Sequence, residues 1–288
     1  MRRQSLLAIS LLSLSGCDRL ATIPYSPEQT PESWLQIQPF VDLKIGTIDF
    51  ILVQPSSTVF VYLLGFITIG VGLYFFHIQG HYQSRKWWGI GLLLWGLGAL
   101  FAGTSYQAFS YEIKCTGQSL CSWTSWWEII YLILSVASID ALLMSGAYSS
   151  CGEKYRKVLK AYALLHIALY STLVIIGVLT LNKFLITFEL LLIFTAPNIL
   201  MLLFLNGRRY FKYRESMDFA LLLTWIWLGV TIGAYATYLL LDFTDDLWEH
   251  GIWFSENDVL HIGLISWMIY ISVYVAKQVT DVSKGDLI

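Results

Sequence analysis

The chain has 288 residues, of which 56% are hydrophobic and 13% are charged. Soluble domains carry about 25% charged residues, so this composition argues against a soluble protein and predicts an integral membrane protein. The net charge of -2 at pH 7, without a long basic cluster, argues against a nucleic-acid partner.

The amino terminus has the pattern of a bacterial export signal. Arg2 and Arg3 precede an apolar run over residues 6–14, and Gly16 comes directly before Cys17. A basic segment, a short apolar segment and a small-residue cleavage site define such a signal, and a cysteine directly after them is typical of a lipobox. The sequence predicts a lipoprotein-type signal peptide over residues 1–16, lipidation of Cys17, and residence in the bacterial cytoplasmic (inner) membrane.

Residues 17–57 are mostly polar and are interrupted by prolines such as Pro24, Pro27 and Pro31. We expect an extracytoplasmic linker or cap here rather than a separate domain. The apolar piece Ile48–Val53 is expected to lie against the outer surface of the bundle.

Seven apolar runs follow, each near the length of about 20 residues that a helix needs to cross a bilayer. They cover Thr58–Phe76, Trp88–Phe109, Trp127–Ser149, Ala161–Leu181, Phe184–Leu205, Phe219–Leu241 and Asp258–Ala276. Their continuous apolar character, without two-residue alternation, excludes a β-barrel. The predicted fold is therefore all-α: a polytopic seven-transmembrane helix bundle over residues 58–276, with a tail over residues 277–288.

The distribution of basic residues predicts the orientation of this bundle. The first, third and fifth loops and the tail carry most of the Lys and Arg residues, whereas the other side carries only Arg19, Lys44, Lys114 and Lys183 after the signal. Loops rich in Lys and Arg stay in the cytoplasm. We therefore expect the N-terminus outside and the C-terminus inside.

The second predicted helix has two stripes of small residues. Gly89, Gly96 and Gly103 recur every seven residues, and Gly91 and Gly98 form a second stripe with Ser105 beside it. Small residues let neighbouring helix backbones approach closely in a membrane. The sequence predicts that this helix is the packing centre; a ligand groove is the alternative.

Cys115 and Cys121 lie together in the loop between the second and third predicted helices. The charge count places this loop outside, in an oxidising compartment where disulfides persist. A disulfide that holds the loop is therefore expected, with free thiols as the alternative.

The predicted outer ends of the second, third and last helices are unusually polar. Candidate side chains there are Ser105, Tyr106, Gln107, Glu112, Glu128, Glu256, Asn257, Asp258 and His261. Asp258 and Asn257 precede His261 by three and four residues, so both can share its helical face. Carboxylate and imidazole on one face can orient a base or bind a metal; the alternative is a hydrogen-bond network that closes the end of the bundle.

The run from Ser255 to His261, which opens the last helix, and the run from Gly103 to Tyr106, which closes the second, carry a family resemblance. The chain resembles the superfamily of alkaline ceramidases and progestin and adiponectin receptors, whose members have seven spans. The resemblance implies a zinc-dependent hydrolase of a lipid amide, with His261 as a metal ligand and Ser105 and Asp258 as assisting catalytic groups. A carboxylate, Glu256 or one of Glu112, Glu128 and Asp258, would complete the metal shell. The chain has Asn257 where the superfamily pattern has a second histidine.

Two further sites involve ionisable residues at membrane depth, which are costly and often functional. Asp140 and His166 are expected at similar depth in neighbouring helices and can pair, either as a proton relay or as a hydrogen bond that fixes helix register. Glu189 is expected in the outer half of the fifth helix, pointing into the same cavity as His261 or bonded to a neighbouring helix.

These patterns favour a multi-pass bacterial membrane lipoprotein whose outward-facing pocket binds a lipid or small ligand. Tyr106, Gln107, Glu112, Glu128, Glu189 and Asn257 are the candidate binding residues, and membrane lipids are the expected partners. The alternative is a metal-dependent intramembrane hydrolase of a lipid amide or ester, in which zinc is the cofactor.

Overall fold

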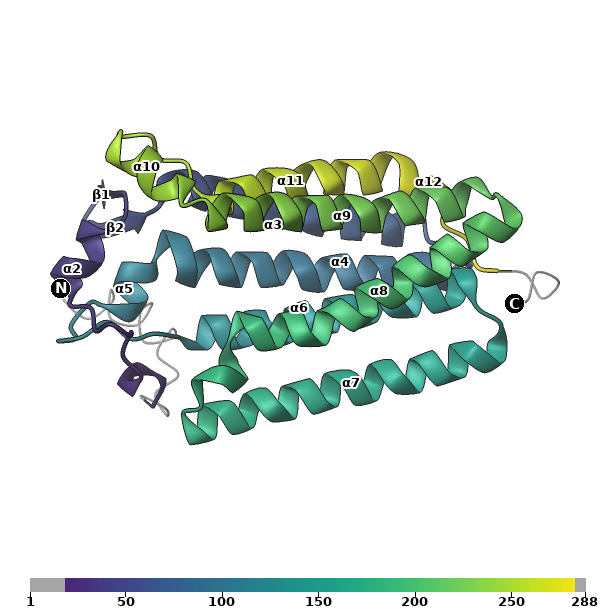
Figure 1. The fold of residues 1–288 in the computed structure, drawn as a ribbon, viewed down its shortest axis with the longest axis horizontal. Helices are drawn as coiled ribbons and strands as arrows, with labels where there is room; N and C mark the ends of the chain where they lie inside the picture. The colour runs from purple at the N-terminus through teal and green to yellow at the C-terminus, as the bar shows by residue number, and fades with distance from the viewer. Residues whose placement is uncertain (1–18, 283–288) are drawn as a thin grey trace.

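The computed structural model describes residues 19–282, so the predicted signal peptide, Cys17 and residues 283–288 of the predicted tail lie outside the described residues. Seven of its helices are long and apolar enough to cross a membrane. They are α3 (Pro55–His77), α4 (Gln83–Ala102) with its continuation η2 (Gly103–Ala108), α6 (Trp126–Ser150), α7 (Glu153–Thr180), α8 (Phe188–Tyr213), α9 (Ser216–Leu240) and α11 (Glu256–Tyr270) with its continuations η4 (Ile271–Val275) and α12 (Ala276–Gln278) (Figure 1). The predicted bundle of seven apolar helices is confirmed, whereas its orientation stays a prediction.

Two helices extend beyond the expected apolar runs. α7 begins at Glu153 rather than at Ala161, and α8 ends at Tyr213 rather than at Leu205. The added turns are rich in Lys and Arg, which are good helix formers. Hydropathy detects only the part of a helix that matches the hydrocarbon thickness, so these charged turns were missed.

Short elements gather at the end of the bundle where the described chain begins (Figure 1). They are η1 (Leu20–Thr22), α2 (Pro31–Gln36), β1 (Phe40–Ile45), β2 (Ile48–Val53) and α5 (Ser110–Lys114). We call these elements the cap, and their side of the bundle the cap end. The short helix α10 (Phe243–Glu249) lies at the same end, and η3 (Lys183–Ile186) joins α7 to α8.

The cap contains a β-hairpin that the sequence analysis did not predict. β1 and β2 pair antiparallel, with Phe40 opposite Val53 and Ile45 opposite Ile48. Gly46 turns the chain with a φ of 64°, a left-handed conformation that glycine adopts without steric cost. The prolines that suggested a linker all precede the hairpin, so they do not interrupt its hydrogen bonds.

The two small-residue stripes of α4 pack against different helices, as expected of a packing centre. A Cβ added at Gly96 would lie 2.8 Å from the Gly65 carbonyl oxygen of α3, and a Cβ added at Gly91 would lie 3.1 Å from the Ser138 carbonyl oxygen of α6. Contacts this short leave room only for hydrogen, so α4 approaches both neighbours at backbone distance.

The end of the described chain is fastened to the start of α4. The Asp281 carboxylate accepts hydrogen bonds from the backbone N–H groups of Gln83 (2.9 Å) and Ser84 (2.8 Å). Arg85 donates from Nε to the Val279 carbonyl (2.7 Å). These bonds satisfy amides that an α-helix leaves unpaired in its first turn.

Candidate functional site

A cavity of about 300 Å³ lies inside the half of the bundle nearer the cap. Six of the seven spans line it, all except α7. Its walls are mainly apolar, with side chains such as Leu64, Ala99, Leu191, Leu228 and Leu264. Ligand pockets typically enclose about 300–1,000 Å³ and have mainly hydrophobic linings, so the cavity has the size and walls for a small apolar ligand or part of a lipid chain.

The exposed residues of the cavity lining belong to α8 and α9. These two helices meet at the end opposite the cap and diverge toward the cap end (Figure 1). Phe188 and Leu192 of α8 and Ile232 of α9 line the cavity and are also exposed.

His261 is the predicted site residue that lines this cavity. It lies in the second turn of α11, is only 7% exposed, and its Nδ1 atom is buried without a hydrogen-bond partner. Tyr131 and Ser135 of α6, Thr195 of α8 and Tyr235 of α9 supply the other polar groups of the lining. Buried polar groups are nearly always hydrogen-bonded, so the free nitrogen of His261 is the notable polar feature of the cavity.

The acidic residues close to His261 in sequence serve the start of α11. Asp258 accepts a hydrogen bond from the Ser255 backbone N–H (2.6 Å) in a capping box, and another from the Ser56 hydroxyl of α3 (3.1 Å). Glu256 accepts from the Thr244 hydroxyl of α10 (2.5 Å), and the Asn257 amide donates to Glu256 (3.3 Å). Capping satisfies the first N–H groups of the helix, which accounts for the acidic pattern without catalysis.

A second group of predicted residues lies under the cap. The Ser105 hydroxyl of η2 donates to Glu128 Oε1 of α6 (2.8 Å) and shares a hydrogen bond with Ser125 (2.6 Å). Glu128 also forms a salt bridge with Lys114 of α5. Lys114 is 1% exposed and Glu128 is 2% exposed, so the pair is out of reach of solvent.

Aromatic rings surround the buried Lys114 ammonium. Its Nζ lies 4.9 Å from the Tyr106 ring centre, 5.9 Å from that of Tyr25 and 6.0 Å from that of Trp34, within the range of cation–π attraction. Burial lowers the pKa of Lys114, but the charges of Glu128 and Tyr25 and their hydrogen bonds outweigh it, so the pKa lies above its usual value. The ammonium therefore stays charged and anchors the cap to the bundle.

The disulfide between Cys115 and Cys121 closes the loop that follows α5. Both cysteines are fully buried against Trp34 of α2. Glu112 accepts a hydrogen bond from the Ile51 backbone N–H of β2 (3.1 Å) and so ties α5 to the hairpin. The sequence analysis placed Glu112 in a ligand site, but its contacts lie within the cap.

The remaining predicted binding residues lie apart from His261. Tyr106 is partly exposed and meets Tyr131 edge to face, with ring centres 6.0 Å apart. Gln107 is buried in η2, and Glu189 is exposed in the first turn of α8. Among the described residues that line the cavity, none of these three appears. The predicted residues thus lie in four places: the cavity, the start of α11, the underside of the cap and, for Glu189, the exposed first turn of α8.

The donor set does not fit catalytic zinc. Within residues 19–282, no three His, Cys, Asp or Glu side chains come close enough together to hold a metal ion. A catalytic zinc site normally takes three protein ligands and a water molecule. Glu256, the predicted second ligand, is hydrogen-bonded to Thr244 and Asn257 instead.

Asp140 and His166 pair as predicted, within a larger network. His166 Nδ1 lies 3.0 Å from Asp140 Oδ2, and the Asn198 amide donates to Asp140 Oδ1 (2.7 Å). The Tyr162 hydroxyl donates in turn to Asn198 Oδ1 (2.8 Å). These bonds join α6, α7 and α8 in the bundle interior, which matches the interpretation that the pair fixes helix register.

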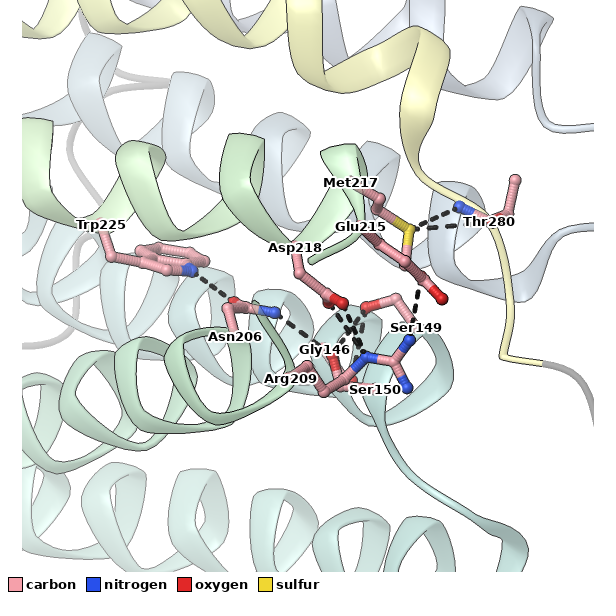
Figure 2. A network of polar contacts seen from close by, with 10 residues as sticks. All are labelled: Gly146, Ser149, Ser150, Asn206, Arg209, Glu215, Met217, Asp218, Trp225 and Thr280. Carbon is pink, nitrogen blue, oxygen red and sulfur yellow. Dashed lines mark hydrogen bonds and ion pairs between the residues drawn. The ribbon is translucent and has the colours of Figure 1, made fainter. Parts of the chain in front are cut away.

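A polar network also closes the end opposite the cap (Figure 2). Arg209 of α8 donates from Nε to both carboxylate oxygens of Asp218 on α9 (3.0 and 3.2 Å) and from Nη2 to Glu215 (3.2 Å). Asn206 accepts from the Trp225 indole (3.0 Å) and donates to Ser150 of α6 (3.2 Å). The network clamps the turn between α8 and α9 at the end where these helices meet.

Lys114, Tyr25 and Tyr235 were not predicted from the sequence. Lys114 appeared only as a basic loop residue, although the Cys115–Cys121 pair beside it signals a structured loop. Tyr25 and Tyr235 had no distinguishing local signal, because their partners lie far away in the chain.

These features define a polytopic helical membrane protein with a capped end and an internal apolar cavity. The chain belongs to DUF6962, a family of unknown function, whose model matches residues 57–278. No curated protein and no solved structure shows a match to this chain. The family match carries no link to the ceramidase and receptor superfamily, so that resemblance stays a prediction.

Proposed function

We propose that this protein binds a lipid chain or a small apolar ligand in the cavity between its spans, without turning it over. The observation that carries the proposal is the apolar cavity, which we infer opens to the bilayer between α8 and α9, where its exposed lining residues Phe188, Leu192 and Ile232 lie. Membrane lipids are the molecules that reach such an opening. The separation of Ser105, Glu128 and Asp258 from the cavity lining favours binding over hydrolysis.

Photocrosslinking with a matched pair of variants tests this proposal. A long-chain alcohol that carries a diazirine in its chain is added to the purified protein in nonionic detergent, irradiated, and mapped by mass spectrometry. Ala236 of α9 lines the cavity, whereas Ala234 on the same helix is exposed and does not line it. We expect Ala236→Phe to reduce labelling of cavity residues by about tenfold or more, and Ala234→Phe to leave it unchanged.

Labelling that falls outside the cavity residues, or that falls equally in both variants, would refute ligand binding there. Both variants must retain the parent's gel-filtration profile in detergent. Because the two substitutions add the same aromatic ring to the same helix, a general effect of the added bulk would appear in both.

We also propose that the protein is lipidated at Cys17 and lies in the bacterial cytoplasmic membrane with the cap outside. The lipobox pattern and the Lys and Arg residues of the loops opposite the cap support this placement. A membrane-impermeant maleimide should label Thr47→Cys in the hairpin turn of intact spheroplasts and should not label Lys157→Cys until the cells are lysed. The reverse pattern would refute the orientation, and failure of the parent protein to incorporate labelled palmitate would refute lipidation.

A further inference from the structure

The polar groups of the cavity lining limit the kind of molecule it accepts. Among the described residues of the lining there is no Asp, Glu, Lys or Arg. An ionised headgroup in such surroundings has no counter-charge, and burying an unpaired charge costs several kcal/mol. The cavity therefore selects against phosphates, carboxylates and quaternary ammonium groups.

Among the described residues of the lining, His261 supplies the buried polar atom that has no hydrogen-bond partner. The imidazole lines the cavity and forms no hydrogen bond within the described part of the chain, whereas the Thr195 hydroxyl already donates to the Leu191 carbonyl (2.9 Å). No hydrogen bond joins His261 to Asp258 or Asn257 in the described part of the chain. Asp258 accepts from Ser255 and Ser56 instead, and Asn257 donates to Glu256. The imidazole is thus available to a molecule inside the cavity.

We propose that the ligand is an uncharged amphiphile: an apolar chain with a neutral hydrogen-bonding group, such as a hydroxyl, ester or amide, which His261 binds. A neutral imidazole has both a donor and an acceptor nitrogen, so it pairs with either kind of group. This inference rests on the proposed binding function and adds the chemical class of the ligand.

Competition among ligands of equal chain length tests the inference. The diazirine-bearing alcohol is the labelled probe, and the competitors are hexadecane, hexadecan-1-ol and hexadecanoate at mildly alkaline pH. We expect the alcohol to compete about tenfold better than the alkane, the effect of a buried hydrogen bond. The carboxylate should compete no better than the alkane.

Variants of His261 locate the hydrogen bond. His261→Phe keeps the bulk of the ring and removes both nitrogens, so the preference for the alcohol over the alkane should fall to less than about twofold. His261→Gln keeps a donor and an acceptor and should retain most of it. His250→Phe, at the exposed histidine that follows α10, is the matched control and should leave the preference unchanged.

The outcomes separate the two proposals. If hexadecanoate competes as well as hexadecan-1-ol, or if His261→Phe keeps the full preference for the alcohol, the inference about the ligand class is wrong although the cavity binds ligands. If no probe labels the cavity in the parent protein, the proposed function itself fails. If His261→Phe does not fold, His261→Ala replaces it, with Ala234→Phe as the control. Loss of the preference for the alcohol over the alkane in His261→Ala, with an unchanged preference in Ala234→Phe, supports the inference. An unchanged preference in His261→Ala overturns it.

Discussion

Breaking the buried pair of Lys114 and Glu128 should destabilise the protein strongly, in a way that depends on pH. The variant Glu128→Gln keeps the shape of the side chain and its hydrogen bond to Ser105 but removes the negative charge. Lys114 is then left 1% exposed without its counter-ion. Removal of one partner of a buried ion pair costs about 3–5 kcal/mol, so the free energy of unfolding should fall by that amount near neutral pH.

The sign of the pH dependence follows from the pKa of Lys114. In the parent protein this pKa lies above the ordinary value of 10.5, so the stabilising contribution is fully present below that value and is lost only as pH rises through the folded-state pKa. In Glu128→Gln the burial that lowers the pKa of Lys114 prevails. The unfolded chain then binds more protons than the folded one, so stability should rise with pH, by up to about 1.4 kcal/mol per pH unit.

Denaturant titrations in nonionic detergent, followed by tryptophan fluorescence with the disulfide intact, measure this difference. Lys114 should leave the free energy of unfolding of the parent unchanged from about pH 8 to about pH 10. Over the same range the free energy of unfolding of Glu128→Gln should rise and recover part of the difference from the parent. Asp49→Asn makes the same chemical change in an exposed pair, whose side chains are 69% and 72% exposed, and should stay within about 0.5 kcal/mol of the parent. A loss below about 1 kcal/mol in Glu128→Gln, or a loss that grows with pH, contradicts the reasoning, since a broken buried pair costs several times more.

Three other changes test the packing and the clamps. Asp218→Asn leaves the buried Arg209 with only Glu215 as a charged partner and should lower the free energy of unfolding by about 3–5 kcal/mol in denaturant titrations. The control Asp245→Asn, at an exposed residue, should change it little. Equal stability of the two variants would show that the Arg209–Asp218 pair does not stabilise the turn between α8 and α9. Gly96→Ala places a Cβ 2.8 Å from the Gly65 carbonyl oxygen and should lower the free energy of unfolding by about 1–3 kcal/mol. Gly233→Ala meets nothing within 4 Å and should leave stability unchanged. If thermal unfolding shows Gly96→Ala to be the more stable variant, the close backbone contact between α3 and α4 is contradicted. Replacement of Cys115 and Cys121 by serine removes a crosslink of sequence separation 6 and should cost about 2 kcal/mol by chain entropy, seen as faster hydrogen exchange in α5 and the loop after it; unchanged exchange would show that the cap is held by other contacts.

The spans and their closest packing could be predicted because both are written in local patterns. A run of about 20 apolar residues has few alternatives to a membrane helix, and the seven-residue spacing of Gly89, Gly96 and Gly103 fixes the face of α4 that meets α3. The depth of Asp140 and His166 also follows from counting residues along their helices at the helical rise of about 1.5 Å per residue. Each of these inferences needs only the chain itself and the geometry of a helix.

The cap and the make-up of the cavity could not be predicted in the same way. The hairpin depends on pairing between β1 and β2 and on support from Glu112, which is 61 residues away from Ile51 in the chain. His261 could be identified as a candidate by its place at the start of the last span, but its cavity neighbours come from five other helices. Asp258 looked like a catalytic group and Glu256 like a metal ligand in sequence, because carboxylates that cap a helix are the same residue types as carboxylates that act in catalysis or bind metal.

The attachment of Asp281 to the first turn of α4 bears on how the protein is made. The acceptor for the Gln83 and Ser84 amides follows all seven spans in the chain, so it is synthesised after them. The first turn of α4 therefore lacks this acceptor until the last span has been synthesised. A nascent chain halted after the sixth span would lack Asp281, so the Gln83 and Ser84 amides would have no acceptor from the C-terminal segment.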